Sequence, residues 1–212
     1  MFDVRLDRFP RATLAHLPTP LEPCRRLHRT HGGPLVWLKR DDCTGLAIGG
    51  NKTRKLEFLL GRALADGAAA VVTTGALQSN HARQTAAAAA RVGLPCHLVL
   101  RRAVPRDDLH YTTSGNVLLD GLLGAEVTVV DTVEEAAAAM AAIAARTGAA
   151  SIPLGGSDPV GVLGYVDAGL ELAEQLAAAG IAASAVVCAA SSCGTAAGLT
   201  IGLAAAGGPP VV

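Results

Sequence analysis

The chain has 212 residues, half of them apolar and 3% aromatic, with 18 basic and 18 acidic side chains. This length suits one large domain or two small ones with a sizeable aliphatic core, and the balanced charge gives no electrostatic reason to expect nucleic acid or an anionic membrane as a partner. The apolar runs are too short to cross a bilayer, and the first ten residues lack the apolar segment of a secretory signal. We therefore expect a cytoplasmic protein whose five cysteines are reduced thiols.

Short apolar runs alternate with longer runs of helical periodicity along the whole chain. The expected strands span 35–39, 70–74, 97–101, 126–130 and 185–189. The expected helices span 52–66, 80–92, 114–122, 133–146, 160–179 and 195–206. Strands that alternate with helices predict an α/β fold with parallel sheets and flanking helices.

The chain divides into two expected domains. Residues 51–152 look like a small αβ domain, whereas residues 1–50 and 153–212 look like parts of a large domain that the chain leaves and re-enters. The last residues are a Gly-Gly-Pro-Pro turn signal followed by two valines that resemble the start of another strand. We therefore expect the large domain to be incomplete and the chain to be truncated at its C-terminus.

The segment Gly49-Gly50-Asn51-Lys52 leads into the first long helix. Two glycines let backbone approach a ligand closely, and the first helical turn favours an anion. A lysine near this positive helix end and near another cation has its neutral amine favoured, which is the form that imine chemistry needs. The alternative is a solvated basic face on an amphipathic helix.

Two further turns follow apolar strands, open helices and carry small or hydroxylated residues. They are 73–81 (TTGALQSNH) and 189–198 (AASSCGTAAG), and both offer N–H and O–H donors to a carboxylate or phosphate. The first could also be a helix cap formed by Ser79 or Asn80, with His81 exposed, and both interpretations can hold together. The second could instead be a tight packing turn. Neither is a Walker A, a G-x-G-x-x-G or a G-x-S-x-G motif, so a nucleotide-binding Rossmann domain is disfavoured.

Metal binding has one candidate, the pair His28 and His31. No third ligand has convincing spacing, so we expect no metal site.

Six segments, in order along the chain, resemble motifs of the D-cysteine desulfhydrase / 1-aminocyclopropane-1-carboxylate deaminase family. They are 37–42 (WLKRDD), 49–57 (GGNKTRKLE), 78–83 (QSNHAR), 114–119 (SGNVLL), 152–157 (IPLGGS) with Gly164-Tyr165, and 191–198 (SSCGTAAG). The resemblance implies a two-domain, fold-type-II pyridoxal-phosphate (PLP) enzyme, with the cofactor between its domains and a homodimeric assembly.

The same resemblance implies roles for individual residues. Lys52 forms the Schiff base with PLP and moves the Cα proton, with Ser79 as a second catalytic residue. The remaining cofactor-binding residues are Asn51, Asn80, Ser192, Cys193, Gly194 and Thr195. The substrate-binding residues are Gln78, Ser79, Asn80 and His81.

The substrate branch depends on a few positions. Ser79-Asn80-His81 resembles the desulfhydrase and sulfo-lyase branch, since the deaminase branch usually carries glutamine where His81 stands. This implies elimination from a small sulfur amino acid: D-cysteine to pyruvate, sulfide and ammonia, or L-cysteate to pyruvate, sulfite and ammonia. The alternatives are 1-aminocyclopropane-1-carboxylate deaminase and, because family members continue well past residue 212, an inactive truncated remnant. Cys193 departs from the family pattern, which has glycine or a small residue there.

Overall fold

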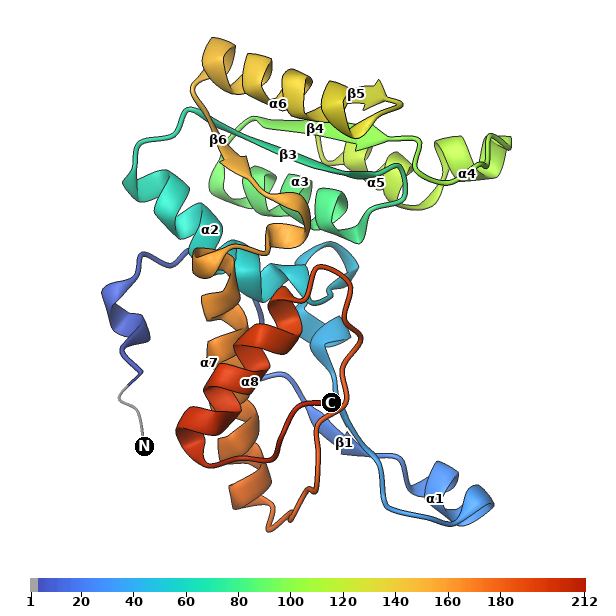
Figure 1. The fold of residues 1–212 in the computed structure, drawn as a ribbon, viewed down its shortest axis with the longest axis vertical. Helices are drawn as coiled ribbons and strands as arrows, with labels where there is room; N and C mark the ends of the chain where they lie inside the picture. The colour runs from blue at the N-terminus through green and yellow to red at the C-terminus, as the bar shows by residue number, and fades with distance from the viewer. Residues whose placement is uncertain (1–3) are drawn as a thin grey trace.

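A four-stranded parallel sheet forms the upper part of the molecule in the computed structural model, which describes residues 4–212 (Figure 1). Its strands are β3 (Ala70–Ala76), β4 (Cys96–Arg101), β5 (Glu126–Val130) and β6 (Ala149–Ile152), in the order β5-β4-β3-β6. The predicted α/β class with a parallel sheet is confirmed. We predicted no secretory signal in the first ten residues, and the first three of these lie outside the described residues.

Helices cover both faces of this sheet. Helix α6 (Val133–Thr147) lies on one face, and α3 (Asn80–Val92) and α5 (Gly115–Leu122) lie on the other, with the short α4 (Leu109–Thr113) leading into α5 (Figure 1). Successive strand residues point to opposite faces, so Val71 of β3 packs in the core with α3 whereas Val72 packs with α6. Both faces are buried, which explains why β3 and β4 are almost continuous apolar runs.

The lower part of the molecule is built on two long helices that lie side by side, α7 (Pro159–Ala178) and α8 (Gly194–Ala206) (Figure 1). Glycines allow their close approach, since a Cβ on Gly169 would lie 2.9 Å from the Cα of Gly202. Beside them, β1 (Leu21–Pro23) and β2 (Trp37–Lys39) form a short antiparallel pair joined through α1 (Arg25–His31).

Helix α2 (Lys52–Ala65) lies between the two parts and packs against both α3 and α7. Its side chains Leu56 and Leu60 are fully buried in the core that also holds the α3 face of the sheet. On the other side, a Cβ on Gly164 of α7 would lie 2.1 Å from the carbonyl oxygen of Arg54. Backbone contact at Gly164 therefore fixes α2 against α7.

Several local predictions differ from the structure. Residues 185–189 do not form the predicted strand, because the only pairing there among residues 4–212 is an isolated parallel bridge between Val186 and Val211. The run at 35–39 shortens to β2 and pairs antiparallel, and β6 was not predicted. The helices at 80–92 and 133–146 match α3 and α6 to within one residue. Within residues 4–212, no helix combines the length and apolarity needed to span a bilayer.

Candidate active site

A polar cavity of about 240 Å³ lies where the start of α2 meets the start of α3 and the loop before α8. Its lining residues are Asn51, Lys52, Asn80, Ala189, Ala190, Ser191, Ser192, Cys193 and Thr195. Six of the residues predicted from the sequence to hold a cofactor therefore lie around one cavity, although they come from three separate chain segments.

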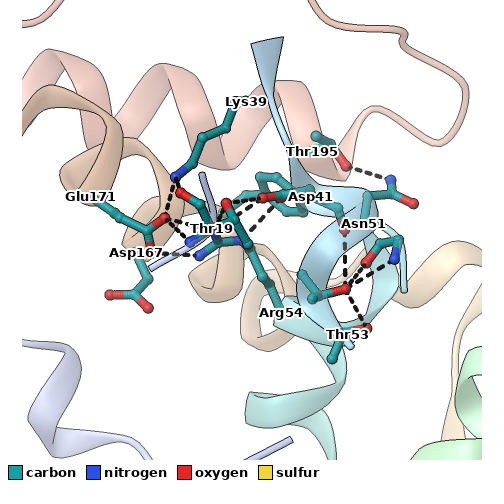
Figure 2. Close-up of polar contacts among 12 residues, drawn as sticks. Thr19, Lys39, Asp41, Asn51, Thr53, Arg54, Asp167, Glu171 and Thr195 are labelled. Atoms are coloured by element: carbon teal, nitrogen blue, oxygen red, sulfur yellow. Dashed lines mark hydrogen bonds and ion pairs between the residues drawn. The ribbon is translucent and has the colours of Figure 1, made fainter. Parts of the chain in front are cut away.

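Asn51 links these three segments by hydrogen bonds. The Nζ of Lys52 donates to the Oδ1 of Asn51 over 2.8 Å, and the Nδ2 of Asn80 reaches the same oxygen at 3.4 Å. The Nδ2 of Asn51 in turn donates to the Oγ1 of Thr195 over 3.0 Å (Figure 2). The lysine amine is thus held among amide and hydroxyl groups at the cavity wall.

Asn51 is available for these bonds because another residue caps helix α2. The Oε1 of Gln84, on α3, accepts from the backbone N–H groups of Lys52 and Thr53 at 3.1 and 3.0 Å. Gly50 makes room for this side chain: its φ is +127°, and a Cβ there would lie 2.8 Å from the Nε2 of Gln84. The helix cap that a sequence would assign to the preceding Asn51 is therefore supplied by the neighbouring helix.

Burial lowers the pKa of Lys52 below its ordinary value of 10.5. Removing an ammonium group from water disfavours its charged form, so the neutral amine becomes more accessible. The predicted direction is confirmed, but the cause is burial rather than a neighbouring cation.

The loop before α8 has the geometry of an anion cradle. Cys193 has a left-handed backbone (φ 59°), helix α8 begins at Gly194, and no side chain among the described residues caps this helix. The exposed first-turn N–H groups of such a helix attract anions. A Cβ on Gly194 would lie 2.5 Å from the Oγ of Ser157, so glycine allows the loop to pack closely.

A buried lysine is connected to this loop through two serines. The Nζ of Lys55 donates to the Oγ of Ser157 over 2.9 Å, and the Oγ of Ser157 lies 2.8 Å from that of Ser192. Burial, with a smaller effect of the nearby Lys52, lowers the pKa of Lys55 to about 8. The sequence placed Lys55 and Ser157 within family-like motifs, at 49–57 and 152–157, but assigned neither residue a role in the site.

The predicted substrate residues are arranged differently from the cofactor residues. Only Asn80 of the four lines the cavity. The Oγ of Ser79 caps α3 by accepting from the N–H of Ala82 over 3.2 Å, as the cap alternative proposed. The amide of Gln78 donates to the carbonyl oxygens of Tyr111 and Ser114 at 2.6 and 2.9 Å.

His81 is buried rather than exposed, which corrects the cap alternative on this point. Its Nε2 lies 2.8 Å from the Oγ1 of Thr73, on β3. Burial, aided by the charges of Lys52 and Lys55, lowers the pKa of His81 to about 3, so the imidazole is neutral at physiological pH. Its assignment to the substrate stays a prediction.

A buried ionic cluster fixes α2 and was not foreseen from the sequence (Figure 2). The guanidinium of Arg54 donates to Asp41 over 3.0 Å and to Glu171, on α7, over 2.9 Å. Lys39 also donates to Glu171, and the hydroxyl of Thr19 bridges Arg54 and Asp41. Its bonded members lie up to 152 residues apart, as for Thr19 and Glu171, so no local motif could reveal the cluster.

A larger cavity, of about 860 Å³, lies beside β2 and α7 and shares Thr195 with the smaller cavity. Its walls are mostly aliphatic, with side chains such as Leu21, Leu172 and Val186. Size alone does not identify a reactive site, and the smaller cavity holds the amine, the amides and the anion cradle.

The residues around the small cavity fit PLP. A partly neutral lysine amine suits the aldehyde of the cofactor, and side-chain amides suit the phenolic oxygen on its ring. The start of α8 suits its phosphate. The glycine at position 194 keeps that helix start open, since a side chain there would meet Ser157 and Lys55.

Comparisons with known proteins agree with this geometry. Residues 12–212 match the model of a family described as "Pyridoxal-phosphate dependent enzyme". The chain is 45% identical over 204 residues to D-cysteine desulfhydrase of Serratia proteamaculans (strain 568), covering 94% of this chain and 62% of the relative. It is 46% identical over 203 residues to D-cysteine desulfhydrase of Klebsiella pneumoniae subsp. pneumoniae, covering 93% and 61%.

Among solved structures, a crystal structure described as an ACC deaminase homologue superposes with a TM-score of 0.82 at 43% identity. The match covers 93% of this chain and 60% of that one. The chain thus spans about three fifths of the length of the relatives that it matches. Because the model of this family matches residues 12–212, the chain belongs to the pyridoxal-phosphate dependent enzymes.

Proposed function

We propose that this chain carries the PLP site of a lyase that eliminates the β-substituent of a small sulfur amino acid, with D-cysteine as the substrate. The observation that carries the proposal is the cavity in which the Lys52 amine, Asn51, Asn80 and the loop before α8 meet. The overall conversion is D-cysteine plus water to pyruvate, hydrogen sulfide and ammonia. The 45–46% identity to D-cysteine desulfhydrases supports this choice of substrate.

The cofactor, when bound, supplies an electron sink for the bond that breaks at the substrate Cα. Lys52 holds the cofactor covalently and then takes the Cα proton, a task for which its lowered pKa suits it. Asn80 and Asn51 orient the cofactor ring. Ser192, Cys193, Gly194 and Thr195 hold its phosphate through the start of α8.

The substrate carboxylate is assigned to the turn that precedes α3. We retain Gln78, Ser79 and His81 in this role as predictions, with Asn80 as the member that already faces the cavity. Because the Ser79 side chain caps α3 and Gln78 is bonded to three backbone groups, these two residues would hold the turn in shape while backbone N–H groups meet the carboxylate.

Three wider expectations also belong to this proposal. We propose that residues 1–50 and 153–212 belong to a large PLP domain and residues 51–152 to a small domain. We propose further that the whole protein is a cytoplasmic homodimer. Light scattering of the purified protein tests the assembly.

A second candidate substrate is 1-aminocyclopropane-1-carboxylate, which the 43% identity to an ACC deaminase homologue supports. L-Cysteate stays an expectation from the family resemblance and is included in the assay below.

The test is a parallel assay of D-cysteine, L-cysteate and 1-aminocyclopropane-1-carboxylate with the PLP-loaded protein. We expect sulfide and pyruvate from D-cysteine, lost in Lys52→Ala and retained in Arg62→Ala, an exposed position on the same helix. Sulfite from cysteate alone, or 2-oxobutanoate from the cyclopropane alone, would reassign the substrate. PLP binding without any turnover would contradict the proposed lyase activity.

A further inference from the structure

Arg83, on α3, is nearly buried but does not line the cavity. Its Nη2 donates to the carbonyl oxygen of Gly49 over 2.9 Å, in the loop that precedes Lys52. Its Nη1 donates to the Oδ1 of Asn116 over 3.1 Å, in the first turn of α5. One guanidinium therefore joins residues 49–51, which we call the lysine loop, to the start of α5.

Asn116 extends this connection to the turn before α3. Its Nδ2 donates to the carbonyl oxygen of Gln78 over 2.8 Å, and its backbone N–H donates to the Oε1 of Gln78 over 2.9 Å. Gly115 permits this contact: its φ is +59°, and a Cβ there would lie 2.7 Å from the Oε1 of Gln78. The 114–116 segment is thus shaped to receive the Gln78 side chain.

Direct contact between the lysine loop and the 78–80 turn is weak. Among the described residues, the side-chain bond that joins them is the long 3.4 Å contact from Asn80 to Asn51. Gln84 also links the two, since its Oε1 accepts from the N–H of Lys52 and its Nε2 donates to the carbonyl oxygen of Asn80 over 3.1 Å, but it does not reach α5. The path from Gly49 through Arg83 and Asn116 to Gln78 is a second connection, and it ties the Gln78 end of the turn to the lysine loop.

We propose that Arg83 is a positioning residue that couples the lysine loop to the 78–80 turn and thereby sets how the substrate carboxylate lies relative to Lys52. The proposal rests on the proposed function of the cavity. Arg83 touches neither cofactor nor substrate in this account, and it acts through Gly49 and Asn116. Its bonds to these two oxygens are charge-assisted, which makes them strong and directional.

The coupling itself can be tested without cofactor, by hydrogen–deuterium exchange of the free protein. Asn116→Ala removes one end of the path and leaves the Arg83 charge in place. We expect faster amide exchange not only near residue 116 but also at residues 49–51, which Asn116 does not touch. Unchanged exchange at 49–51 would overturn the coupling, whatever the protein does with PLP.

The effect on the substrate is tested with D-alanine, an amino acid without a β leaving group, added to the PLP-loaded protein. In Arg83→Met we expect the Kd for D-alanine to rise about tenfold, as for the loss of one charge-assisted bond, while the Kd for PLP changes less than about threefold. Arg83→Lys, which keeps the charge, is expected to restore part of the D-alanine affinity.

Arg91→Met is the matched control, since Arg91 is exposed near the end of the same helix. Unaltered D-alanine affinity in Arg83→Met, or an equal loss in Arg91→Met, would contradict the proposal. If Arg83→Met fails to fold, the D-alanine titration of Asn116→Ala decides the same question, because wild-type affinity there also contradicts it. Failure of the wild-type protein to bind PLP at Lys52 would instead refute the proposed function and leave the exchange experiment valid.

Discussion

Arg54 is a buried charge on the helix that carries Lys52, and its guanidinium neutralises two carboxylates from distant parts of the chain, Asp41 and Glu171. Breaking a buried ion pair by removing one partner leaves an uncompensated charge, which costs far more than losing a surface pair. In Arg54→Met we therefore expect the free energy of unfolding, measured with urea, to fall by about 3–5 kcal/mol. Arg62→Met removes an exposed ion pair with Asp66 and should change the free energy of unfolding by less than about 1 kcal/mol. Equal effects of the two substitutions would contradict this role.

Asp120 is a buried carboxyl group, and neither of its oxygens has a hydrogen-bond partner among residues 4–212. Burial raises its pKa to about 7, although the charge of Arg83 opposes the shift. The folded protein thus holds this proton more tightly than the unfolded chain, so the contribution of Asp120 to the free energy of unfolding falls as pH rises from about 4 to 7.

Asp120→Asn removes this titration. The free energy of unfolding of the variant minus that of the wild type should therefore become more positive as pH rises from 5 to 7, and then level off. Asp66→Asn, at an exposed carboxylate, is the matched control. Urea unfolding at several pH values measures the difference, and a difference that does not vary with pH would show that Asp120 is already ionised at pH 5.

For individual residues, the sequence predicted which side chains lie around the cavity but not the hydrogen bonds that position them. The lysine, the two asparagines and the hydroxyl-rich loop do line one cavity, because each stands at a strand or helix end where backbone donors are free. The cap from Gln84 and the path through Arg83 and Asn116 depend on how α3 packs against α2 and α5. No local spacing encodes such packing.

The position of α2 as an element depends on its backbone contact with α7 at Gly164. In Gly164→Ala the new methyl group would meet the carbonyl oxygen of Arg54, so the helices must separate. We expect a loss of about 2–3 kcal/mol in the free energy of unfolding, as for an overpacked core, with weaker PLP binding because Lys52 moves with α2.

Gly121→Ala is the matched control for this substitution. Gly121 lies in α5, and a Cβ there would meet nothing within 4 Å. Replacing a helical glycine by alanine in open space should stabilise the protein by up to about 1 kcal/mol. Thermal or urea unfolding of both variants checks the pair, and a Gly164→Ala protein as stable as the wild type would show that α2 and α7 can separate without cost.

Helices and strands were predictable where the hydrophobic pattern of the segment itself was clear. β3, β4 and β5 are buried or paired apolar runs between helices, and their parallel order follows from the alternation of strands and helices. The run at 185–189 has the same composition but has only Val211 to pair with among the described residues. Strand β6, with the sequence AASI, is too short and alanine-rich to stand out from the helix before it.

For the whole molecule, the cavity depends on bringing together segments that lie far apart in the chain. Lys52 and Asn80 are 28 residues apart in the sequence, and Asn51 and Thr195, which are hydrogen-bonded, are 144 residues apart. Since α2 packs against helices of both parts of the molecule, movement of one part relative to the other would change the cavity directly. A cofactor bound there would therefore stabilise the arrangement of the whole chain by linkage.

The central claim is that Lys52 holds PLP, and the chain is well suited to a direct test because it has three lysines in all, Lys39, Lys52 and Lys55. Lys39 is paired with Glu171, and Lys55 is bonded to Gly155 and Ser157, whereas Lys52 faces the cavity. We would incubate the purified protein with PLP, reduce it with borohydride and map the label by mass spectrometry. The account predicts pyridoxyl label concentrated on Lys52 and lost in Lys52→Ala. Label spread equally over Lys39, Lys55 and the amino terminus, or no label at all, would contradict it.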